Sequence, residues 1–206
     1  MKKILAALLA ASMTFALYSC ALPWEDSSSE SGSDSSSASD SESAESGDQS
    51  SKEKKKVKKG NFEGTGYTLD IDEKKWENIT DTIQQVDAAF RYIGNEEDKN
   101  LSTSNFNVMV TKGAGSTKPE DYVEVVKNQY SSLGYTILGS SAEDFNGYSA
   151  QVMNVEMTQN DLTMELKQVI MVEDDTLFVI SYGSEKSVFE EISPEFDTVL
   201  STFGIL

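Results

Sequence analysis

Apolar and polar residues follow strand-like patterns between Tyr135 and Tyr182, and this stretch predicts four consecutive β-strands joined by tight turns. The clearest turn is Asn146-Gly147, because both central residues of a type I′ hairpin need positive φ. Asn160-Asp161 and Asp174-Asp175 are weaker signals of the same kind. Leu177–Ile180 is apolar at four successive positions, so we expect that strand to be covered on both faces. The pattern predicts an antiparallel meander with helices on either side.

Shorter alternating segments upstream predict three more strands. Tyr67–Ile71 has the alternation of a half-buried strand, and Ala89–Ile93 and Phe106–Val110 also alternate. The polar residues 95–104 are expected to form the loop between the second and third of these strands. Trp76 is expected in a loop or short turn, with an indole that closes the core or, alternatively, serves as a ligand platform.

Two segments have the three- and four-residue spacing of amphipathic helices. The first opens at Thr117, which has capping-box spacing to Glu120, and ends at Gly134. The second is expected to begin at Ser193-Pro194 and to stop at Gly204, after a separate short turn around residues 188–192. The residues expected to face the core are Tyr122, Val125, Val126, Gln129, Tyr130 and Leu133 in the first helix and Phe196, Val199, Leu200 and Phe203 in the second. Tyr148, Met153, Met157, Met164 and Met171 are also expected in the core, rather than on a recognition surface.

The order of these elements is strand, two strands, helix, four strands, helix. It predicts an α+β fold with an antiparallel sheet of about six to seven strands and helices packed on it. Residues 66–71, Trp76, the central helix and the closing Ser201-Thr202-Phe203 resemble the PsbP-like superfamily over about residues 64–206. That resemblance implies a PsbP-like sandwich and a binding or accessory role without catalytic residues.

The N-terminus has the organisation of an export signal. Two lysines precede an apolar segment, Ile4–Leu17, which is too short to span a bilayer comfortably. It ends in Leu17-Tyr18-Ser19-Cys20, which resembles a bacterial lipobox, although Tyr18 departs from the usual small residue. The lipobox implies lipid attachment at Cys20; the alternative is an ordinary secretory signal with an incidental cysteine. We therefore expect a signal peptide over residues 1–19.

Composition divides the rest of the chain into a tether, residues 20–60, and one globular domain, residues 61–206. Residues 27–51 include 14 serines among acidic and small residues, so they cannot bury enough apolar surface to order the chain. The lysine-rich run Lys52–Lys59 follows. It is interpreted either as an attraction to anionic lipids or wall polymers, or as solvated linker paired loosely with the acidic tract.

Charge and residue usage exclude several classes of function. Residues 61–206 carry 9 basic and 26 acidic side chains, and such a field repels nucleic-acid phosphates. The chain has no histidine, and Cys20 is its only cysteine. This composition excludes Ser-His-Asp and Cys-His catalysis, Cys/His zinc sites and disulfides within the chain. We expect no catalytic residue, metal site or cofactor, and no nucleic-acid partner.

The remaining motifs match known sites poorly. Asp70–Glu73 begins like a calcium loop, but Lys75 and Asp81 occupy the positions that need Gly and Glu. The acidic stretches 95–98 and 173–175 are expected to be solvated turns, with weak Ca²⁺ binding as the alternative. Gly113–Ser116 lacks the spacing of a phosphate loop and is expected to be a mobile turn.

These observations predict a lipid-anchored, extracytoplasmic binding or accessory protein of the cell envelope. Its expected partners are the membrane, through the N-terminal lipid, and an unidentified envelope protein or small ligand. The alternatives are a hydrolase of wall or carbohydrate polymers that uses a carboxylate pair, and a surface-display spacer with no ligand.

Overall fold

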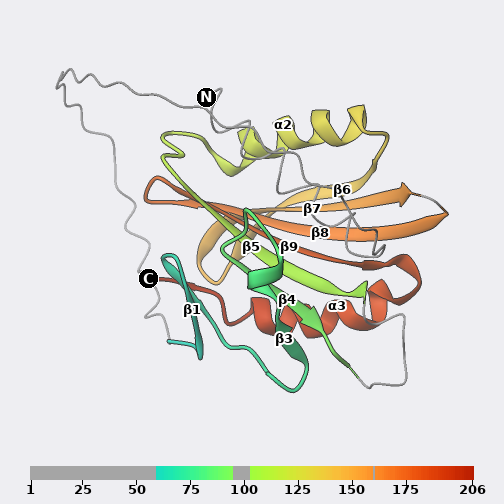
Figure 1. Ribbon diagram of the computed structural model, residues 1–206. Coiled ribbons are helices and arrows are strands. Elements are labelled where there is room, and N and C mark those ends of the chain that lie inside the picture. The colour runs from blue at the N-terminus through green and yellow to red at the C-terminus, as the bar shows by residue number, and fades with distance from the viewer. Residues whose placement is uncertain (1–58, 95–102, 160) are drawn as a thin grey trace, which may run out of the picture.

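The computed structural model describes residues 59–94, 103–159 and 161–206, which form two antiparallel sheets and two α-helices (Figure 1). The large sheet has the strand order β3-β4-β5-β9-β8-β7-β6 and the small sheet the order β1-β2-β10. The helices are α2 (Pro119–Ser132) and α3 (Lys186–Leu200), and Thr80–Thr82 form a 3₁₀ turn. The strands are β1 (Phe62–Gly64), β2 (Tyr67–Leu69), β3 (Trp76–Asn78), β4 (Ala88–Tyr92), β5 (Asn105–Lys112), β6 (Thr136–Phe145), β7 (Tyr148–Gln159), β8 (Leu162–Glu173), β9 (Thr176–Glu185) and β10 (Gly204–Ile205).

The meander predicted from residues 135–182 is confirmed as β6 to β9. Asn146 and Gly147 have φ of 52° and 88°, as a type I′ turn requires. Asp174 and Asp175 also have positive φ, 44° and 65°. Asp161 has φ of 67°, whereas Asn160 lies outside the described residues. Local turn chemistry therefore sets the register of the C-terminal hairpins.

The large sheet is packed on both faces, with α2 on one side and α3 on the other (Figure 1). Leu177–Ile180, in the interior strand β9, is at most 3% exposed, as predicted. The core on the α3 side includes Trp76, Phe106, Phe178, Tyr182 and Phe196, and the core on the α2 side includes Val123, Val126, Tyr130, Met153 and Ile170. Met153, Met157 and Met171 are buried, and Tyr148 and Met164 pack against the cores, so these residues are core as expected.

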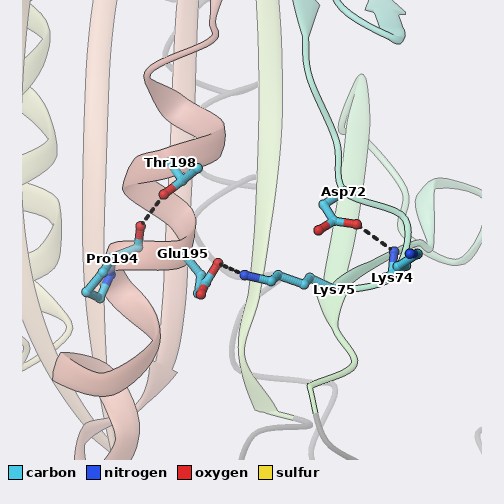
Figure 2. Close-up of polar contacts among 6 residues, drawn as sticks. All are labelled: Asp72, Lys74, Lys75, Pro194, Glu195 and Thr198. Atoms are coloured by element: carbon cyan, nitrogen blue, oxygen red, sulfur yellow. Dashed lines mark hydrogen bonds and ion pairs between the residues drawn. The ribbon is translucent and has the colours of Figure 1, made fainter.

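The C-terminal helix begins at Lys186, and the prediction of a start at Ser193-Pro194 was wrong. Pro194 lies inside α3, where its lack of an N–H removes one helical hydrogen bond. The carbonyl that would accept from an N–H at position 194 is that of Glu190. Both residues are exposed, so water can reach this carbonyl. The Thr198 hydroxyl donates to the Pro194 carbonyl at 2.9 Å (Figure 2). Burial of the continuous apolar face of α3 outweighs the local penalty of the proline.

The helix α2 also differs in detail from its sequence pattern. Its N-cap is Lys118 rather than Thr117, and Asp121 accepts the Lys118 backbone N–H at 3.2 Å. Val123 is buried, whereas Val125 and Leu133 are 38% and 43% exposed. The helix therefore presents a face rotated from the predicted one.

The N-terminal strand was predicted to be half-buried in the main sheet. Instead β2 pairs with β1 and β10 in the small sheet, and all three of its residues are buried. Trp76 begins β3 rather than lying in a loop, and its ring is edge-on to Phe106 with centroids 4.9 Å apart. The indole is 2% exposed, so its predicted place in the core is confirmed.

Candidate functional site

The lipid-attachment residue predicted from the sequence, Cys20, lies outside the described residues, as do residues 21–58 of the predicted tether and the acidic stretch 95–98. Within the described ranges, no three His, Cys, Asp or Glu side chains are arranged to hold a metal ion. In the same part of the chain, neither α-helix has the length and apolar character needed to cross a bilayer.

The acidic turn between β8 and β9 has a structural partner. The backbone N–H groups of Gly113 and Ala114 both donate to the Asp175 carbonyl at 3.0 Å, and the Gly115 N–H donates to the Asp175 carboxylate. The sequence predicted a mobile turn at Gly113–Ser116. Three hydrogen bonds instead fix this segment to the β8–β9 turn.

The helix α3 leaves part of its face of the large sheet open. Side chains alternate between the two faces of the sheet along β7 and β8. Val152 in β7 and Val169 in β8 belong to the core on the α3 side. Every second residue after Val152, and every second residue before Val169, therefore lies on that same side. None of the eight positions that continue this face toward the β7–β8 turn is fully buried. We call this set the open sheet face: Thr136, Gly139, Asn154, Glu156, Thr158, Thr163, Glu165 and Lys167.

The open sheet face is polar and of mixed charge. Lys186, at the start of α3, contacts the Glu156 carboxylate, and Lys167 Nζ lies 2.6 Å from Asp197 Oδ1. The hydroxyls of Thr158 and Thr163, which are also cross-strand partners, lie 3.1 Å apart. This surface offers hydroxyl, carboxylate and ammonium groups to a polar partner.

Two carboxylates on this face are brought together by strand register. Glu156 and Glu165 are direct cross-strand partners. Burial raises the pKa of Glu165, Lys186 lowers it, and Glu190 and Glu156 raise it further. Glu165 therefore has a raised pKa, whereas Glu156 has a direct contact with the Lys186 ammonium group.

Sequence reasoning missed this pair, although the signal was present. The weak turn signal at Asn160-Asp161, taken as a two-residue turn, would have made Gln159 and Leu162 partners and, counting outward, Glu156 and Glu165, and these pairs are observed. The contact between Lys186 and Glu156 could not be found in this way, because Lys186 belongs to α3 and no predicted helix included it.

A second polar contact crosses the same side of the molecule. Lys75, in the connection between β2 and β3, places its Nζ 2.7 Å from Glu195 Oε2 on α3 (Figure 2). The hydrogen bond to Glu195 raises the pKa of Lys75. Nearby, the Lys74 backbone N–H donates to the Asp72 carboxylate at 3.0 Å, which closes the turn that precedes β3 (Figure 2). These residues hold the N-terminal connection against α3.

Comparison with known proteins decides the family. A family model described as "Probable lipoprotein LpqN" matches residues 49–201. The chain belongs to this lipoprotein family. The match includes the end of the serine-rich segment and the lysine-rich run as well as most of the folded domain. A search of curated proteins found no match.

This LpqN-type lipoprotein is similar to several solved structures at low sequence identity. CyanoP from Synechocystis sp. is 15% identical, with a TM-score of 0.50 over 68% of this chain and 87% of that one. LpqN of Mycobacterium tuberculosis, named as involved in cell envelope biogenesis, is 15% identical, with a TM-score of 0.47 over 70% and 86%. The Ran-binding protein Mog1p of Saccharomyces cerevisiae is 10% identical, with a TM-score of 0.47 over 68% and 90%. At such identities the CyanoP likeness supports the PsbP-like fold alone.

Proposed function

We propose that this protein is a non-catalytic binding or accessory lipoprotein, anchored through Cys20 on the extracytoplasmic side of the membrane. The observation that carries the proposal is the lipoprotein-family match over residues 49–201. It agrees with a lone cysteine at the end of an apolar N-terminal segment. The envelope role named for the mycobacterial LpqN supports the same assignment.

The open sheet face is the surface we assign to partner binding. Its hydroxyl, amide and charged groups stand at the solvent side of the sheet, next to the first turn of α3. Such a surface recognises a polar partner through hydrogen bonds and charge complementarity rather than through apolar burial. The proposed partner is an envelope protein or a polar small ligand.

Lipid labelling of cells that express the full chain tests the anchor. The wild-type protein should incorporate a radiolabelled fatty acid and sediment with membranes, whereas Cys20→Ala should be unlabelled and released. Ser19→Ala is the matched control, because it keeps a small residue beside the cysteine and should still be labelled. Protease treatment of intact cells reports orientation: the domain should be cleaved from the outside. Labelling of Cys20→Ala, or full protection of the domain, would refute the anchor or its orientation.

Cross-linking in intact envelopes tests the binding surface. Thr163→Arg places a bulky cation on the open sheet face and should reduce the yield of specific cross-linked adducts. Val125→Arg is the control, because Val125 is an exposed position on α2, across the sheet. Equal loss with both variants, or with neither, would argue against this face.

Hydrolysis of wall or carbohydrate polymers is the second candidate. It is favoured by the opposed Glu156 and Glu165 and by the raised pKa of Glu165, since glycosidases use a neutral acid beside an ionised carboxylate. Release of soluble fragments from purified cell wall by the wild-type protein, and its loss in Glu165→Gln, would establish this function instead.

A further inference from the structure

We propose that Asn146 is a deamidation site that the native fold protects from reaction, and that its deamidation would detach the C-terminal strand β10. The proposal is independent of the binding function. It rests on the turn between β6 and β7, where Asn146 is followed by glycine, the neighbour that obstructs the reaction least. Asn146-Gly147 is the only Asn-Gly pair in the 206 residues.

The reaction requires two nitrogens of this turn. The backbone nitrogen of Gly147 attacks Cγ of Asn146 and forms a C–N bond, while the side-chain nitrogen leaves as ammonia with the proton lost from Gly147. Water then opens the five-membered succinimide at either carbonyl, and the product is aspartate or isoaspartate. Water is the only co-reactant, and no oxidant or reductant takes part.

The fold engages the attacking nitrogen. The Gly147 N–H donates to Asp144 Oδ1 at 2.9 Å. The turn holds this geometry because Asn146 and Gly147 both have positive φ. The nucleophile is therefore hydrogen-bonded to a carboxylate rather than free to approach Cγ.

The fold also engages the leaving group. Asn146 Nδ2 donates to the Phe203 carbonyl at 2.9 Å and lies 3.4 Å from the Leu200 carbonyl. These carbonyls lie at the end of α3 and just before β10, so the side chain is held away from its own peptide. Deamidation in the native state requires this part of the structure to open first.

The same contacts show what the reaction would change. An aspartate or isoaspartate carboxylate has no N–H to donate and would place negative charge against the carbonyl oxygens of Leu200 and Phe203. Isoaspartate would also lengthen the backbone of a two-residue turn. The adjacent β10 is short: it pairs with β2, and its Ile205 N–H donates to the Tyr148 hydroxyl at 3.3 Å. We call the hydrogen bonds from Asn146 Nδ2 to the Phe203 and Leu200 carbonyls the Asn146 latch. Loss of this latch should therefore free β10.

Ageing of the full chain, purified from membranes in detergent, tests the closed site. Peptide mapping by mass spectrometry at mildly alkaline pH measures conversion at Asn146. The native protein should convert at least about tenfold more slowly than the same protein in denaturant. Asp144→Ala should accelerate native conversion, whereas Asp144→Asn keeps an acceptor oxygen and should remain slow. Glu143→Ala is the matched control, because its carboxylate accepts from Ser141 instead.

Hydrogen exchange tests the latch separately. Asn146→Asp is itself one of the two products. It should speed hydrogen exchange at the amides of Ile205 and Leu206 and leave exchange at the amides of α2 unchanged. Circular dichroism confirms that each variant remains folded. Equal conversion of Asn146 in native and denatured protein would overturn the closed site, and unchanged exchange of β10 in Asn146→Asp would overturn the latch.

Discussion

Glu156 of β7 and Glu165 of β8 stand directly opposite each other on the open sheet face. Like charges at such cross-strand positions destabilise an antiparallel pair. Lys186 contacts Glu156, so one carboxylate has a cationic partner. Burial raises the pKa of the other, Glu165, and is the largest effect on it; Lys186 lowers this pKa, and Glu190 and Glu156 raise it. The charged form of Glu165 therefore opposes folding.

Replacing Glu165 with glutamine should stabilise the protein at neutral pH. The pKa of Glu165 in the folded chain lies above its ordinary value of 4.5, so the folded state binds more protons than the unfolded state in the pH range between these two pKa values. The free energy of unfolding must then fall as the pH rises through the raised pKa. Glu165→Gln removes this loss. Because solvent screens the charge at this partly exposed position, the gain should be at most about 0.5 kcal/mol near pH 7 and should vanish below about pH 4.

Urea denaturation across this pH range measures the effect. Glu73→Gln is the matched control, because it removes an exposed carboxylate outside the strands. It should show no comparable dependence on pH. A loss of stability in Glu165→Gln at neutral pH would contradict this prediction. It would mean that a favourable interaction of the Glu165 carboxylate outweighs its repulsion from Glu156.

Asp175 should be important for stability although it lies in an exposed turn. Its carboxylate accepts the Gly115 N–H, and its backbone has φ of 65°. Asp175→Ala loses this hydrogen bond and places alanine in the left-handed region, so it should cost about 2 kcal/mol of unfolding free energy. Asp175→Asn keeps an acceptor oxygen and tolerates this φ, so urea denaturation should show a much smaller loss. Equal losses in the two variants would assign the effect to charge instead.

The parts of the fold that depend on neighbouring residues could be predicted from sequence. The hairpins from β6 to β9 depend on turns such as Asn146-Gly147, whose positive φ values are a local property. The small sheet could not be predicted, because β2 pairs with β10, which is far along the chain and only two residues long. Pro194 was wrongly predicted to lie at the start of a helix. Burial of α3 against the sheet outweighs the helix-breaking effect of the proline.

The candidate site was predictable to a similar extent. The opposition of Glu156 and Glu165 follows from the turn signal in the sequence at Asn160-Asp161, but the alignment of β6 does not. The register of β6 shifts between Ile137 and Gly139. A glycine inside a strand often marks a bulge, but it does not specify the register that results. The contacts of α3 residues with the open sheet face depend on tertiary packing, which periodicity does not report.

A buried hydrogen-bonded row beneath α2 gives a third prediction. The Tyr130 hydroxyl donates to Gln168 Oε1 at 3.2 Å, and Gln168 Nε2 donates to Ser181 Oγ at 2.9 Å. Gln168→Leu removes both bonds inside the protein and should cost about 2 kcal/mol of unfolding free energy. Adding Ser181→Ala should restore part of that loss, because the serine hydroxyl no longer needs a partner. A double-mutant cycle by urea denaturation measures the coupling, and strict additivity would mean that the bond to Ser181 contributes nothing.

Alkaline titration should show delayed ionisation of three of the eight tyrosines. Burial raises the pKa of Tyr182 to about 12 and raises the pKa values of Tyr67 and Tyr122 still further above 10. The unfolded chain therefore loses these protons first, and stability must fall as the pH rises past 10. Phenolate absorbance should show a late phase from these three tyrosines that coincides with loss of helical circular dichroism. In denaturant all eight should titrate together near pH 10. Tyr182→Phe keeps the ring that stacks on Phe196 and should move alkaline unfolding to higher pH. Complete ionisation near pH 10 with the secondary structure intact would contradict the burial of these three hydroxyls.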